Sequence, residues 1–196
     1  LMNSDRDAES VGGALSEAGF AQVTVATDLD RNQMEAVLQQ FAATSAADIE
    51  SLATRFVAST LPHGEWTHLA HLTVGLWHVD RYSNEEALDR LRGGIRKLND
   101  SHGTINSASS GYHETITRVY VQLLAEFNGR YATQESLPER VNRLCKSKLA
   151  QKDALLNFYS RTALMSEKAR AGWVAPDLAP ICLGRLDTAA DNGSGT

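Results

Sequence analysis

The sequence is poor in the features that mark secreted or membrane-bound proteins. Its 196 residues include only two cysteines, Cys145 and Cys182. They have neither the number nor the spacing of a disulfide framework or a cysteine-rich zinc site, so we expect reduced thiols. No apolar run approaches the roughly 18 residues of a membrane span, and the N-terminus lacks the pattern of a signal peptide. We therefore expect a cytoplasmic protein that does not act at a membrane.

Positive charge is also scarce. The net charge is −5, from 19 basic and 24 acidic residues. Residues 1–30 hold six acidic residues and one arginine, a net of −5, so residues 31–196 are neutral overall. Because a nucleic-acid groove needs a dense basic face, we expect no nucleic-acid partner. One basic cluster stands at near-helical spacing and predicts a solvated helix face: Arg140, Arg143, Lys146 and Lys148.

Only four prolines interrupt the chain, and 42% of its residues are hydrophobic. That composition and length suit a single domain with its own core. Apolar residues recur at helical spacing, and no pair of strands is visible. We predict an all-α fold, a single-domain helical bundle of about six to seven helices.

The boundaries of the helices follow from capping residues. Ser45, Thr67 and Ser83 are predicted N-caps, and residues 149–161 are expected to form the last long helix. After it, residues 174–180 predict an extended C-terminal strap anchored by Trp173. The bundle is expected to span residues 31–186, between an acidic, weakly structured segment (1–30) and a disordered tail (187–196).

Histidines are concentrated between His63 and His78, which holds four of the six. On a helix, His68, His71 and His78 fall on one stripe flanked by leucines and Trp77. Buried imidazoles need partners, since an unpaired buried polar group costs about 1–3 kcal/mol. We expect His78 to be a hydrogen-bonded core residue. A metal ion or a reacting ligand is the partner predicted for the others.

Chain connectivity predicts which histidines meet. Short connections between helices near residues 66–80, 84–99 and 112–128 give an up-down-up arrangement, so the first and third start at the same end of the bundle. His68 and His71 lie in the first turns of one, and His113 opens the other. The sequence therefore predicts a three-histidine site for a divalent transition metal: iron, zinc, manganese or copper. Glu114 would be a general base or a fourth ligand.

Other residues near the predicted site suit substrate binding. Tyr112 is assigned to the catalytic site and Trp66 to closing its pocket. Arg161 and Arg170, close to an aromatic residue, would bind an anionic small molecule through paired hydrogen bonds. The alternative for Arg170 is an ion pair with Asp177 that holds the strap.

Three motifs carry a resemblance. They are Trp66-Thr67-His68-Leu69-Ala70-His71-Leu72, then Gly111-Tyr112-His113-Glu114-Thr115-Ile116-Thr117, and Ser166 with residues 169–178. Together they resemble a group of small bacterial proteins of uncharacterised function, over roughly residues 50–180. The resemblance implies a helical, cytoplasmic domain whose shared motifs contain the three histidines. It implies no particular activity.

Two functions remain open at this point. The first is a small-molecule metalloenzyme that performs oxygen-dependent oxidation or water-activating hydrolysis. The second is a non-catalytic helical module, with a buried histidine network, that binds a ligand or another protein. A neutral main body is compatible with a monomer or a homodimer.

Overall fold

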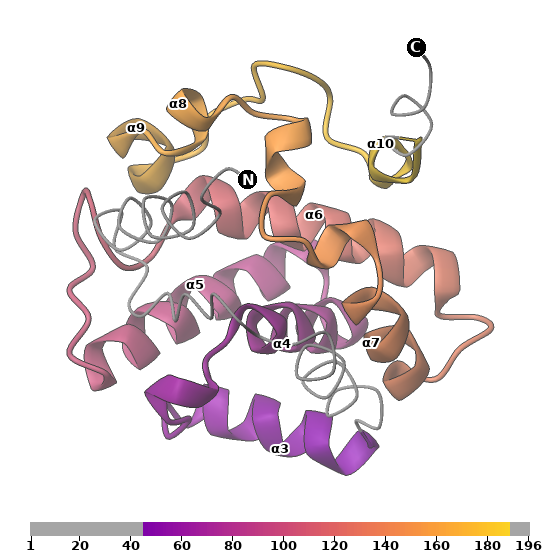
Figure 1. The fold of residues 1–196 in the computed structure, drawn as a ribbon. Helices are drawn as coiled ribbons and strands as arrows, with labels where there is room; N and C mark the ends of the chain where they lie inside the picture. Colours follow the sequence, from indigo (N-terminus) through magenta and orange to yellow (C-terminus); the bar gives the residue numbers. More distant parts are fainter. Residues whose placement is uncertain (1–44, 189–196) are drawn as a thin grey trace, which may run out of the picture.

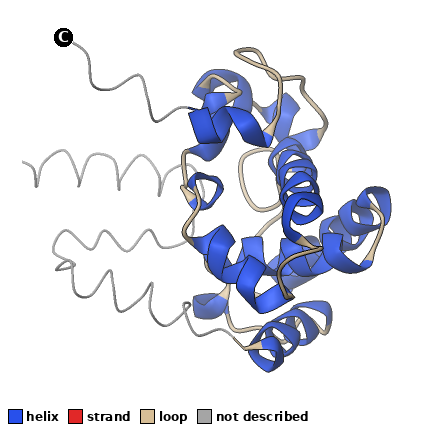
Figure 2. Ribbon diagram, turned by 90° about the vertical axis from the view of Figure 1, so that its right-hand side faces the viewer, coloured by secondary structure: helices blue, strands red, loops and turns tan. Residues whose placement is uncertain are grey.

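The computed structural model describes residues 45–188, and in this part of the chain all regular secondary structure is helical (Figures 1 and 2). This confirms the all-α prediction. The longer helices are α3 (Ala46–Val57), α4 (His68–Arg81), α5 (Asn84–Ser101), α6 (Glu114–Tyr131) and α7 (Leu137–Cys145). The shorter ones are α8 (Arg161–Leu164), α9 (Glu167–Ala171) and α10 (Leu183–Thr188), with 3₁₀ turns η1 (His63–Glu65), η2 (Lys148–Ala150) and η3 (Ala154–Asn157).

Local signals begin these helices where the sequence predicts. Ser45 and Asp48 form a reciprocal capping box at α3. The Thr67 hydroxyl accepts the Ala70 N–H at 3.2 Å, and the Ser83 hydroxyl accepts the Glu86 N–H at 3.3 Å. Each bond satisfies a backbone donor that the first helical turn leaves free.

Helix α4 lies at the centre of the bundle and packs against α3, α5, α6 and α7 (Figure 1). Its buried side chains include Leu72, Val74 and Leu76, which meet Leu123 and Leu124 of α6 in the core. At Gly75 a Cβ would lie 2.6 Å from Leu124 Cδ1, so the missing side chain allows α4 and α6 to approach closely. The helix that carries three of the six histidines is therefore the one that the core surrounds.

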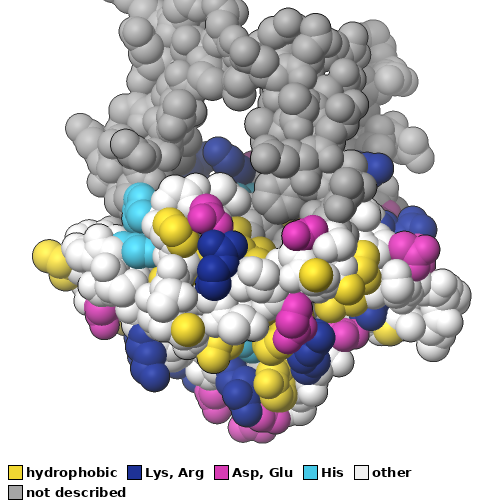
Figure 3. All heavy atoms as spheres, turned by 90° about the horizontal axis from the view of Figure 1, so that it is seen from below, with side chains coloured by type: hydrophobic (Ala, Val, Ile, Leu, Met, Phe, Trp, Pro, Cys, Tyr) yellow, Lys and Arg dark blue, Asp and Glu magenta, His cyan; other side chains and the backbone are white. Residues whose placement is uncertain are grey.

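An ion pair joins α4 to α7. Arg140, only 6% exposed, donates to Asp80 Oδ1 at 2.6 Å and also contacts the Asn128 amide oxygen. Figure 3 shows the molecule from below, the side on which α3 lies in Figure 1. The described residues on this face carry charged side chains of both signs, interspersed with apolar ones. None of the helices in residues 45–188 combines the length and the apolar character needed to cross a bilayer.

The prediction of one long helix over residues 149–161 is wrong. This stretch forms η2 and η3, separated by the exposed residues 151–153. Leu149, Leu155, Phe158 and Tyr159 are all buried. A single helix would direct neighbours such as Phe158 and Tyr159 about 100° apart, whereas the bent path brings both into the core.

The C-terminal strap is present, but Trp173, its predicted anchor, is exposed. It runs from the end of α9 to the start of α10 without regular structure. Helix α10 continues to Thr188, so the first two residues of the expected tail lie in a helix, and Asp187 accepts from Arg130 at 2.8 Å. The acidic segment 1–30 and the first residues of the expected bundle, 31–44, lie outside the described residues.

Candidate functional site

His113 is the N-cap of α6, and both of its ring nitrogens are bonded. Its Nδ1 accepts the Ile116 N–H at 3.3 Å, and its Nε2–H donates to the Leu164 carbonyl at 2.9 Å. The two bonds need opposite roles, so together they select the neutral tautomer protonated on Nε2. Burial, with the charge of Arg170 as the next cause, lowers the pKa of His113 to about 4. The ring is therefore neutral at physiological pH.

His68 and His71 lie on successive turns at the start of α4 and bind different carbonyls. His68 donates from Nε2 to Ala150 of η2 at 3.1 Å, and His71 donates from Nδ1 to Thr67 at 2.7 Å. Burial lowers the pKa of His68. His71 is exposed and stacks on Trp66, with ring centroids 3.7 Å apart. The two imidazoles therefore bind two different backbone carbonyls and no common partner.

The structure offsets His113 from His68 along α6. The ring of His68 packs against Tyr120, with centroids 6.0 Å apart. Tyr120 follows His113 by seven residues, which is a rise of about 10 Å on an α-helix. Within residues 45–188, no group of three or more His, Cys, Asp or Glu side chains is placed to hold a metal ion. The three-histidine metal site accordingly stays a prediction.

Glu114 and Tyr112 form a compact polar cluster with Arg92. The guanidinium of Arg92 donates to both carboxylate oxygens of Glu114, at 2.9 and 2.6 Å, and the Tyr112 hydroxyl donates to Oε2 at 2.9 Å. The bonds from Arg92 are the main cause of a lowered pKa for Glu114. Burial raises the pKa of Tyr112 to about 12. The carboxylate is therefore ionised and accepts three hydrogen bonds.

The residues expected to bind substrate are dispersed. Trp66 stacks between His71 and Phe56, and Arg161 is exposed at the start of α8. Arg170 donates to the Gly111 carbonyl at 2.9 Å. The alternative pairing of Arg170 with Asp177 is not formed, because the Asp177 carboxylate accepts the Ser160 N–H at 2.8 Å instead.

The strap is held by residues of the second motif. The Thr115 hydroxyl donates to the Gly172 carbonyl at 2.7 Å and accepts the Val174 N–H at 3.0 Å. Tyr159 donates to the Val174 carbonyl at 2.8 Å. Together with His113 and Arg170, these bonds explain much of the second and third motifs as contacts between α6 and the C-terminal segment.

Of the remaining histidines, His78 is the buried core residue that we expected. Its Nδ1 donates to the Val74 carbonyl at 2.8 Å. His102 is the C-cap residue of α5 and donates from Nε2 to the Leu61 carbonyl at 2.7 Å. Its ring also packs on that of His63.

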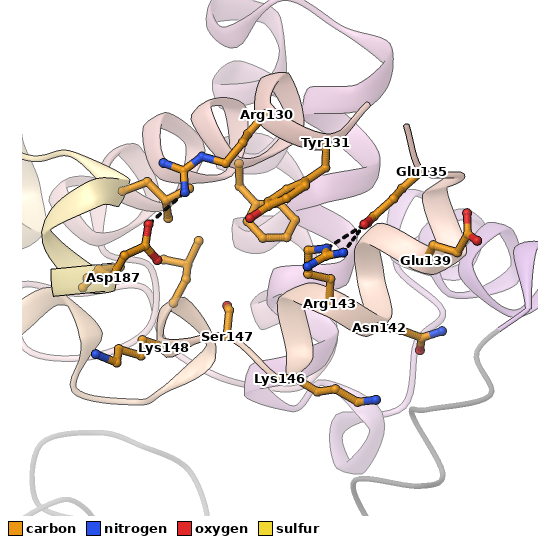
Figure 4. A pocket seen from close by; sticks show the side chains of 14 residues that line it. Arg130, Tyr131, Glu135, Glu139, Asn142, Arg143, Lys146, Ser147, Lys148 and Asp187 are labelled. Carbon is orange, nitrogen blue, oxygen red and sulfur yellow. Dashed lines mark hydrogen bonds and ion pairs between the residues drawn. The ribbon is translucent and has the colours of Figure 1, made fainter. Parts of the chain in front are cut away.

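A cleft that the sequence did not predict lies between α6, α7, η2 and α10. Its volume is about 620 Å³, within the roughly 300–1,000 Å³ of small-molecule sites. Its wall includes Arg143, Lys146 and Lys148, three of the four residues that the helical spacing assigns to a solvated face. This basic cluster was the one feature of the sequence that could have indicated the cleft. The sequence does not show, however, that α10 forms the opposite wall of the cleft. We call it the α6–α10 cleft (Figure 4).

Comparison with protein-family models, with curated proteins and with solved structures finds no match for the chain. The resemblance carried by the three motifs stays a prediction.

Proposed function

We propose that this protein is a helical binding module whose buried histidines hold the bundle together. The observation that carries the proposal is the double hydrogen bonding of His113, which caps α6 and ties it to the Leu164 carbonyl. A histidine ligand must offer a metal ion a free lone pair on one ring nitrogen. His113 has none to offer unless the cap or the bond to Leu164 is broken.

The hydrogen bonds of Glu114 support the same proposal. A general base needs a carboxylate that is free to take a proton and has a pKa near the working pH. Glu114 instead accepts from Arg92 and Tyr112, and its pKa is lowered. These bonds favour a structural role, in which Glu114 fixes α5 against the start of α6.

The metalloenzyme remains the second candidate, and one observation favours it. Burial lowers the pKa of His68, so its ring is neutral at physiological pH, as metal binding requires. Its Nδ1 and the Nε2 of His71 take no hydrogen bond from the other described residues. A metal site built on His68 and His71 would need other ligands in place of His113.

Metal analysis of the full chain, purified without a histidine tag, separates the two functions. We expect substoichiometric iron, zinc, manganese and copper, and a thermal midpoint that chelator leaves unchanged. A stoichiometric metal that is lost in the His68→Ala, His113→Ala double variant would overturn the proposal. The control is the His63→Ala, His102→Ala double variant, which removes the paired rings of η1 and the end of α5 and should leave the metal content unaltered.

A further inference from the structure

The side chains that line the α6–α10 cleft carry more positive than negative charge. Four are cations, namely Arg130, Arg143, Lys146 and Lys148, and three are acids, namely Glu135, Glu139 and Asp187. The difference is one positive charge. The lining is therefore better suited to an anion than to a cation.

Two of the cations converge on Tyr131. The guanidinium of Arg143 lies over the Tyr131 ring, 4.6 Å from its centroid, and Arg130 lies beside the Tyr131 hydroxyl. Figure 4 shows the Arg130–Asp187 and Arg143–Glu135 pairs on opposite sides of the cleft, with Tyr131 and Ser147 between them. Each guanidinium has five N–H donors. Arg143 uses Nε and Nη2 for Glu135, whereas Arg130 has two carboxylates near it, Asp187 at 2.8 Å and Glu126 at 3.9 Å. Arg143 therefore keeps donors for a ligand oxyanion.

Lys148 provides the observation that points to a missing partner. Its Nζ is buried and has no hydrogen-bond partner in the described part of the chain. A buried ammonium without an acceptor is unfavourable, so an anion in the cleft that Lys148 lines would stabilise it. Glu135 Oε2 and Asn142 Oδ1, which also line the cleft, are buried without partners too. They are acceptors, which water or ligand hydroxyl groups would satisfy.

The rest of the cleft wall is apolar. Phe127, Leu149, Leu183 and Leu186 line it, and each is almost fully buried. The protein already shields these four from water, whereas the half-buried ring of Tyr131, which also lines the cleft, still offers a ligand apolar surface. A ligand with an apolar body would cover it and gain from removing it from water.

We propose that the α6–α10 cleft binds a small organic anion, whose phosphate or carboxylate group pairs with Arg143 or with Lys148 and whose apolar body lies on the Tyr131 ring. The inference rests on the proposed binding function and names its site and ligand class. Guanidinium groups match both oxyanions through paired hydrogen bonds, so the geometry favours the shared chemistry of the two acids.

Titration of the full chain with four matched compounds, followed by amide chemical shifts, tests the proposal. Phenyl phosphate and benzoate share a ring and differ in the acid, benzyl alcohol has the ring without charge, and inorganic phosphate has the charge without the ring. We expect saturable binding of at least one organic acid, with a dissociation constant of about 1 mM or lower. Benzyl alcohol and inorganic phosphate should each bind about tenfold more weakly. The stronger of the two acids identifies the preferred oxyanion.

Two variants and a matched control locate the binding. At least one of Arg143→Gln and Lys148→Gln should weaken the preferred acid by about tenfold, which identifies the cation that holds the acidic group. The control is Arg90→Gln, because Arg90 resembles Arg143 closely: both side chains are 49% exposed, both pair with a glutamate, and both lie over a tyrosine ring. The hollow beside Arg90 is lined by three acids, so the Arg90 variant should bind normally.

Two outcomes overturn the inference: neither organic acid saturates the shifts at about 10 mM, or the Arg90 variant weakens binding as much as the Arg143 and Lys148 variants do. Each variant is first compared with the parent chain by thermal unfolding, and Lys148→Gln remains a test if Arg143→Gln is poorly folded. Stoichiometric metal would refute the proposed function without moving these titrations. Failure of the titrations would refute the proposed ligand class and would leave the metal analysis, and so the proposed function, unaffected.

Discussion

The imidazole of His113 joins two distant parts of the chain, because its Nε2–H donates to the Leu164 carbonyl 51 residues further on. The same ring caps α6 through Nδ1, and it is only 7% exposed. Protonation of Nδ1 would remove the cap and place a positive charge at a helix N-terminus, where the helix dipole disfavours it. The cap of α6 therefore depends on a neutral ring, whereas the Nε2–H bond to Leu164 does not.

The first prediction is a loss of stability in acid. The pKa of His113 is about 4 in the folded protein, against 6.5 for an unperturbed histidine. Between these values the unfolded chain binds the proton more readily, so the free energy of unfolding should fall as the pH drops from about 6.5 to about 4. We expect His113 to contribute about 2 kcal/mol to this fall after allowance for solvent screening.

Urea unfolding at a series of pH values measures this loss. His113→Asn is the informative variant, since asparagine keeps an N-cap acceptor but does not titrate. Its stability should depend less steeply on pH over this range. A variant with the same pH dependence as the parent would show that other groups, such as His68 and His78, carry the effect.

The second prediction concerns Thr115 and the strap. Thr115→Val keeps the shape of the side chain but removes the bonds to Gly172 and Val174. It leaves a part-buried carbonyl and N–H without partners, so we expect about 1–3 kcal/mol of destabilisation. The Val174 amide should also exchange with solvent faster in native-state hydrogen exchange. Thr117→Val is the control: it removes the bond to the His113 carbonyl but touches neither Gly172 nor Val174, so unchanged exchange at Val174 is expected there.

The sequence predicted what local chemistry determines. The N-caps at Ser45, Thr67 and Ser83 depend on neighbours within the same turn, and all three are present. His78 could be assigned to the core because apolar residues lie on both sides of the histidine stripe on its helix. The irregular path of residues 149–161 could not be predicted, because it depends on which parts of the core Leu149, Phe158 and Tyr159 fill.

The candidate sites show the same division. That α4 and α6 pack together follows from short connections, but the axial offset between them depends on side-chain packing at contacts such as His68 with Tyr120. That offset decides whether three rings share a point. The α6–α10 cleft depends on α10 returning to α6, and the 57-residue separation of Arg130 and Asp187 leaves no local trace of this contact.

The third prediction compares a buried ion pair with an exposed one. Arg140→Ala leaves Asp80 without its main partner and should destabilise the protein by about 3 kcal/mol, because breaking a buried pair leaves an uncompensated charge. Arg90→Ala breaks the exposed pair with Glu86 and should cost at most about 1 kcal/mol. Chemical denaturation of both variants measures the difference. Equal losses would mean that Asp80 is well solvated in the folded protein.

The fourth prediction uses two adjacent glycines of α5. A Cβ at Gly94 would lie 2.5 Å from the Phe56 ring, whereas a Cβ at Gly93 would meet nothing within 4 Å. Gly94→Ala should therefore destabilise the protein by about 1–3 kcal/mol, because the buried Phe56 ring has little room to move. Gly93→Ala should stabilise it by about 0.5–1 kcal/mol, since alanine loses less backbone entropy on folding into a helix. Thermal and urea unfolding measure the sign of the stability change in both variants. A stabilising Gly94→Ala would contradict the close packing of Phe56 in α3 against Gly94 in α5.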